Sequence, residues 1–202
     1  MSNSHVRDFA NLYQYLVRED LPVFLLMAGL YDNVERLQNV EHLTFLYRAP
    51  KIRLEALGMR SIALNYERIL CIDHREAQRM ARLTNGYPFA FQLLGQRAWE
   101  HHGLTDEAFD EYRTQLSELS YDKIWSELSD GDRSMAHGIA TAPSSSVMDV
   151  RFILDLKSNE FSPYRRCLIR MGVIDGSERG KVSFTLPLFR AYVLERYGEI
   201  DI

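Results

Sequence analysis

The sequence has few cysteines and no long apolar run, and these two absences argue against a secreted protein and a membrane protein. Cys71 and Cys167 lie far apart and show no Cys-x-x-Cys spacing, which predicts a reducing, cytoplasmic compartment. The longest apolar run, Val23 to Ala28, is far shorter than the roughly 20 residues that a membrane-spanning helix needs. The first residues have no signal-peptide pattern. We therefore expect neither secretion nor a membrane partner.

Motifs of common enzyme classes are also missing. The sequence has no H-E-x-x-H, no G-x-S-x-G and no G-x-x-x-x-G-K-[ST], and its one Gly-Lys pair is followed by Val182. No apolar run ends in Asp-Glu, so neither the phosphate-binding loop (Walker A) nor the magnesium-binding acid (Walker B) of an ATPase is present. His101 and His102 are better explained as favourable charges at a helix end than as metal ligands. We expect no metal site and no ATPase activity from this chain alone.

The composition is that of a folded protein with a substantial core. Of 202 residues, 46% are hydrophobic and 11% aromatic, which excludes a disordered chain. The net charge of -4 gives no general attraction to polyanions, so any nucleic-acid surface must be a local patch.

Apolar residues recur at helical spacing over most of the chain, which predicts a mainly α (α+β) fold. Val23–Ala28 and Lys51–Leu54 are the candidate strands of a parallel sheet. Two strands leave such a sheet unfinished, so either a third strand is hidden or the chain is part of something larger. The helices are expected at 6–17, 59–70, 77–84, 88–99, 105–116, 130–140, 147–156, 162–171 and from 188 onward.

The pattern divides into three predicted parts. Residues 1–57 hold the remnant of the sheet, residues 58–120 form a helical subdomain, and residues 121–202 form a C-terminal domain. Nine acidic and two basic residues between His101 and Asp132 indicate a solvated linker, with a hinge at Leu116–Ser129. In the C-terminal part three helices precede a β-hairpin, which is the order of a winged helix-turn-helix.

Four stretches carry a resemblance to a known family: LPVFLLMAGL, LTFLYRAPKIRLEAL, TNGYPFAFQLLGQRAWE and FSPYRRCLIRMGVIDGSERGKVSFTLPLFRAYV. In order and spacing they resemble prokaryotic AAA+ ATPases related to archaeal origin-recognition-type initiators and STAND NTPases. The resemblance covers nearly the whole chain and corresponds to the C-terminal portion of that family. It implies a truncated ATPase core (1–57), a helical lid (58–120) and a winged-helix domain (121–202).

The resemblance also implies cofactors and partners. ATP with Mg would be the cofactor of the parent protein and is not expected to bind tightly to this chain alone. The implied partners are a missing N-terminal ATPase core, DNA, and a second copy of the chain.

Individual residues take roles from the same resemblance. Arg48 is similar to the arginine that reaches a nucleotide on a neighbouring subunit, with an ordinary loop arginine as the alternative. Gly86, Tyr87 and Pro88 resemble the lid motif G-x-P near the nucleotide, whereas Phe89 stands where initiators place an arginine. Local structure also explains the motif, as a glycine after one helix and a proline at the start of the next.

The C-terminal helix predicted at 162–171 has one apolar and one basic face. Ser162 is expected as its N-cap and Pro163 at its first position. The residues at core spacing are Tyr164, Cys167, Leu168 and Met171.

The basic residues of this region are the candidate DNA contacts. Arg165, Arg166 and Arg170 are expected on the open face of the helix, in the position of a major-groove recognition helix. Arg179 and Lys181 lie in the predicted hairpin turn, where a wing would touch phosphates. A docking surface for another protein remains the alternative, because a winged helix alone does not fix the function.

Overall fold

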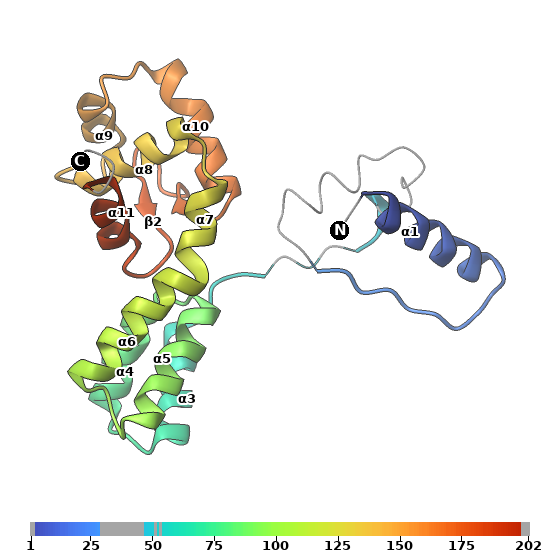
Figure 1. Ribbon diagram of the computed structural model, residues 1–202, viewed down its shortest axis with the longest axis horizontal. Coiled ribbons are helices and arrows are strands. Elements are labelled where there is room, and N and C mark those ends of the chain that lie inside the picture. Colours follow the sequence, from blue (N-terminus) through green and yellow to red (C-terminus); the bar gives the residue numbers. More distant parts are fainter. Residues whose placement is uncertain (1–2, 29–46, 51, 53, 199–202) are drawn as a thin grey trace. The chain divides into compact units, whose positions relative to one another are not determined.

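The computed structural model describes residues 3–28, 47–50, 52 and 54–198 (Figure 1). The chain divides into two compact units, residues 1–53 and residues 54–202. The described residues are mainly helical, as the sequence predicts. No helix among them is both long enough and apolar enough to cross a membrane.

The first unit contains α1 (Asn3–Arg18), an amphipathic helix in which Ala10 is buried. The strand predicted at Val23–Ala28 is wrong: these residues form no strand, and the side chain of Phe24 is 87% exposed. A strand exists only where a neighbouring strand accepts its hydrogen bonds, and the described residues of this unit provide none. Ile52 and Leu54 are likewise outside any strand. Lys51 and Arg53, the rest of that prediction, lie outside the described residues.

The second unit begins with four helices whose ends follow local rules. The Asp73 carboxylate caps α4 by accepting a hydrogen bond from Glu76 N–H at 2.8 Å, and Asn85 ends α4 in the left-handed conformation. Pro88 starts α5 at its first position, and Thr105 caps α6. The end of α4 at Asn85 and the starts of α5 and α6 confirm those predicted from the sequence, whereas α4 starts three residues earlier than predicted. The bounds are α3 (Met59–Leu70), α4 (His74–Thr84), α5 (Pro88–Glu100) and α6 (Asp106–Leu116).

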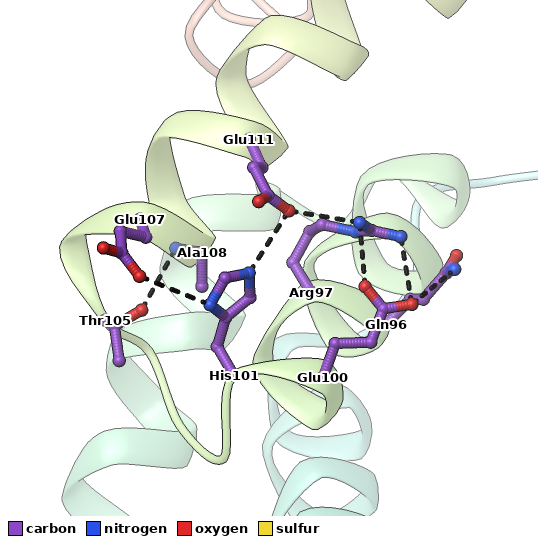
Figure 2. Close-up of polar contacts among 8 residues, drawn as sticks. All are labelled: Gln96, Arg97, Glu100, His101, Thr105, Glu107, Ala108 and Glu111. Atoms are coloured by element: carbon purple, nitrogen blue, oxygen red, sulfur yellow. Dashed lines mark hydrogen bonds and ion pairs between the residues drawn. The ribbon is translucent and has the colours of Figure 1, made fainter.

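A cluster of ion pairs joins the end of α5 to the start of α6 (Figure 2). Arg97 Nη1 lies 2.8 Å from a Glu100 carboxylate oxygen and 3.1 Å from one of Glu111. His101 Nε2 lies 3.3 Å from the same Glu111 oxygen, and its Nδ1 lies 3.8 Å from Glu107. The two helices are thus held by charge at one end of their contact.

The solvated linker expected around residues 101–132 is wrong for its second half. After α6 the chain continues as a π-helical turn (Ser117–Tyr121) and α7 (Asp122–Glu127). Leu116, Tyr121 and Trp125 are buried in this stretch. The acidic residues occupy the outer face of a helix whose other face is apolar, so their number did not indicate a linker.

The C-terminal part packs three helices against a small hairpin. They are α8 (Asp130–Thr141), α9 (Val147–Ile153) and α10 (Ser158–Arg170), followed by β1 (Ile174–Asp175), β2 (Ser183–Phe184) and α11 (Phe189–Gly198). The strands are antiparallel, with Ile174 opposite Phe184. An antiparallel bridge between Ser146 and Lys181 adds a third short segment to this hairpin, just before α9.

One continuous core runs through the second unit. Tyr121, at the end of the π-helical turn, packs its ring against Phe189 and Tyr192 of α11 at centroid distances of 5.0 and 5.5 Å. Its hydroxyl donates to the backbone oxygen of Pro187. The boundary predicted between residues 120 and 121 therefore falls inside a packed helical segment.

Candidate nucleic-acid interface

The helix expected to meet DNA, α10, starts one turn earlier than predicted. It begins at Ser158, not at Ser162, because the Glu160 carboxylate accepts the Lys157 N–H at 2.8 Å and so caps the earlier turn. The Ser162 hydroxyl instead donates back to the Ser158 oxygen at 2.6 Å, and Pro163 lies inside the helix. Ser162 and Pro163 are typical of a helix start, but the cap formed by Glu160 starts α10 one turn earlier.

The inner face of α10 is the predicted one. Leu168 is fully buried, and Tyr164, Cys167 and Met171 are half-buried, with Phe161 added by the longer helix. This orientation leaves the opposite face of α10 toward solvent.

Only two of the three arginines expected on the open face are exposed there. Arg166 and Arg170 are exposed, one turn apart. The prediction for Arg165 is wrong: one of its terminal nitrogens donates to the Gly176 oxygen at 2.8 Å, and its Nε is buried without a partner. Arg165 therefore fixes the hairpin against α10. Its position next to the buried side of the stripe was the signal that could have shown this.

The hairpin turn brings the two remaining basic residues to one loop. Arg179 is exposed, and Lys181 Nζ forms an ion pair with Glu178 at 2.6 Å. Across the loop, the N–H and hydroxyl of Ser177 donate to the Asp175 carboxylate and hold the pKa of that carboxyl below its usual range. The turn is thus ordered by its own hydrogen bonds and carries its cations outward.

Two apolar side chains beside this region were not singled out from the sequence. Met148 and Phe152 lie one turn apart on α9 and are 74% and 88% exposed. Their i, i+4 spacing, on a helix whose buried residue is Val150, was the available signal.

Gly86, Tyr87 and Pro88 have a structural role in this arrangement. Gly86 has a φ of +75°, and a Cβ built on it would lie 2.7 Å from the Leu57 oxygen. The Gly86 oxygen accepts the Leu57 N–H at 2.8 Å, and the Tyr87 hydroxyl lies 3.0 Å from that of Ser120. The motif, with Pro88 starting α5, packs the incoming chain onto the helices. The Leu57 backbone lies directly against Gly86, and the nucleotide-binding role of Gly86, Tyr87 and Pro88 stays a prediction.

Two further predictions concern the position of Arg48 and the absence of a metal site. Arg48 is exposed in a short 3₁₀ turn of the first unit. In the part of the chain that the structure describes, no three His, Cys, Asp or Glu side chains come together as a metal site.

Comparisons with known proteins identify one segment. A family described as a domain of unknown function (DUF8462) matches residues 119–193, which span the last residues of the π-helical turn through the first half of α11. No curated protein and no solved structure matches the chain.

Proposed function

We propose that residues 130–198 form a winged helix that binds duplex DNA. The order of elements supports this: α8, a bridging segment at Ser146, α9, α10, and then the β1–β2 hairpin. In a winged helix the third helix enters the major groove and the hairpin touches the adjacent backbone. Here the corresponding elements are α10 and the loop between β1 and β2.

The exposed cations support the same proposal. Arg166 and Arg170 are about 6 Å apart along the axis of α10, since each residue rises about 1.5 Å. Arg179 and Lys181 extend from the loop after β1. Contacts of this kind go mainly to phosphates, so binding would be tolerant of sequence and strongly weakened by salt.

We further propose that this winged helix belongs to an ATPase of the AAA+/STAND type, as the C-terminal partner of a nucleotide-binding core. The exposed apolar segment Val23–Ala28 supports this, because such a segment is typical of a surface that another part of a protein covers. ATP and Mg belong to the core in this proposal. The contribution of this chain is the Gly86–Pro88 turn, as a packing element between the incoming segment and the helices.

The DNA proposal is tested by fluorescence anisotropy with a labelled 30-base-pair duplex over a salt series. The variant Arg166→Ala/Arg170→Ala should bind several-fold more weakly, with a salt slope reduced by about 0.9 per lost phosphate contact. Arg113→Ala/Lys123→Ala removes the same charge from exposed positions of α6 and α7 and serves as the control. Absence of binding by the parent at low salt, or an unchanged slope in the variant, would reject the proposal.

A protein-docking role is the second candidate, and the exposed pair Met148 and Phe152 favours it. Large apolar side chains this exposed are typical of interaction sites. Under this alternative, Phe152→Ser abolishes capture of a protein partner while Arg166→Ala/Arg170→Ala leaves it intact.

A further inference from the structure

Helix α4 has a row of arginines that the proposed winged helix does not use. Arg75, Arg79 and Arg82 lie at i, i+4 and i+7 and are all exposed. This spacing places them on one face of the helix, along about 10 Å of its axis.

The opposite face of α4 is fully occupied by the core. Ala77 and Met80 are completely buried, and Ala81 is 2% exposed. The apolar side of α4 is therefore inaccessible to a ligand, and a partner that binds α4 contacts the arginine row.

Acidic side chains of the same helix hairpin are held elsewhere. A Glu76 carboxylate oxygen accepts the Leu104 N–H at 3.1 Å, at the end of the loop between α5 and α6. Glu67 pairs with His74. Among the described residues no carboxylate forms an ion pair with Arg75, Arg79 or Arg82.

We infer that the arginine row of α4 binds the phosphate backbone of a nucleic acid. Three guanidinium groups in line fit a linear polyanion, and each can donate two parallel hydrogen bonds to phosphate oxygens. Such contacts carry no sequence information and raise affinity by releasing counterions. The row is a second contact surface, separate from α10 and the hairpin.

Hydrogen bonds connect this surface to the proposed winged helix. Asn85, one turn beyond Arg82, donates from its amide to the Thr185 oxygen at 2.7 Å. The Thr185 N–H donates to the Val173 oxygen at 3.0 Å, at the base of the β1–β2 hairpin. The end of α4 is thereby fixed to the element that would hold DNA. The inference rests on the proposed function for this choice of partner.

A lipid surface fits these observations less well. A helix that binds at a membrane interface inserts an apolar face beside its basic one. In α4 that face is Ala77, Met80 and Ala81, all within the core. The residue between the arginines on the exposed side is Gln78, which is polar.

The test uses the full chain and the labelled 30-base-pair duplex over the same salt series. Arg75→Gln/Arg79→Gln/Arg82→Gln should bind about tenfold more weakly at low salt and reduce the salt slope by about 0.9 for each arginine that meets a phosphate. The double variant Arg79→Gln/Arg82→Gln removes two positive charges from the row. Its matched control is Arg113→Gln/Lys123→Gln, which removes two positive charges elsewhere. Glutamine keeps the helix propensity of arginine, so the thermal midpoint should not change.

The outcomes separate this inference from the proposed winged-helix function. A weakened row variant supports the inference, even when Arg166→Ala/Arg170→Ala binds like the parent and so rejects the winged-helix contact. An unchanged row variant beside a weakened Arg166→Ala/Arg170→Ala overturns the inference and leaves the winged helix standing. The inference is also overturned when the row variant loses binding only to phosphatidylserine vesicles, or loses only self-association measured by light scattering.

Discussion

At the scale of single residues, two glycines in the same conformation have different surroundings. Gly86 and Gly180 have φ values of +75° and +77°. A Cβ on Gly86 would meet the Leu57 oxygen at 2.7 Å, whereas a Cβ on Gly180 would have no atom within 4 Å. Conformational strain is thus common to both, and crowding belongs to Gly86 alone.

We predict different losses of stability for the two alanine substitutions. Gly180→Ala should lower the free energy of unfolding by about 1 kcal/mol, the cost of a left-handed alanine. Gly86→Ala should lower it by about 2–4 kcal/mol, because the clash with a backbone oxygen adds to that strain. Urea unfolding followed by circular dichroism measures both. Equal losses would show that Leu57 does not pack on Gly86.

Arg165 shows at the same scale what a sequence pattern leaves undetermined. Helical spacing correctly placed Leu168 in the core and Arg166 and Arg170 outside it. Arg165 lies at the border between the two faces, where a long side chain can reach either solvent or a neighbouring loop. Its hydrogen bond to the Gly176 oxygen depends on where the hairpin lies, which no local pattern specifies.

At the scale of elements, the charge cluster between α5 and α6 makes stability depend on pH (Figure 2). Hydrogen bonds from Arg97 and then from His101 lower the pKa of Glu111 below its ordinary value. A carboxyl whose pKa is lower in the folded state stabilises the protein above its unfolded pKa. This stabilisation disappears as the pH falls through the folded pKa.

We therefore predict that Glu111→Gln flattens part of the acid dependence of the thermal midpoint between about pH 5 and pH 2. Above this range the variant should unfold at a lower temperature than the parent, and the difference should shrink as the pH falls. Differential scanning calorimetry in a pH series measures it. Glu118→Gln, an exposed carboxylate outside the cluster, is the control. A difference independent of pH would show that packing, not charge, is lost.

Most helices were predictable from the sequence because their ends have local causes. Asp73, Asn85, Pro88 and Thr105 cap or start helices through their own side chains or conformations. The strand at Val23–Ala28 failed because a strand requires partners remote in sequence. The prediction of a hinge at Leu116–Ser129 failed for a related reason. The number of acidic residues alone does not show which face of a helix is buried.

At the scale of the whole molecule, the core indicates which parts fold together. Among the residues that the structure describes, all buried apolar residues except Ala10 lie between Ile62 and Val193. The Asn85–Thr185 hydrogen bond at 2.7 Å crosses the boundary predicted at residue 120. The segment matched by the DUF8462 family, 119–193, therefore shares its core with the helices before it.

We predict that residues 54–202 alone unfold cooperatively, with a thermal midpoint within about 3 °C of that of the full chain, because they form a compact unit of their own. Residues 119–202 should unfold at a midpoint lower by more than about 5 °C, since they lose the contacts of α4 and α5. Circular dichroism at 222 nm measures all three proteins. A shorter piece as stable as residues 54–202 would instead show that residues 119–202 form an independent domain, joined to the helices before it by contacts that contribute little to its stability.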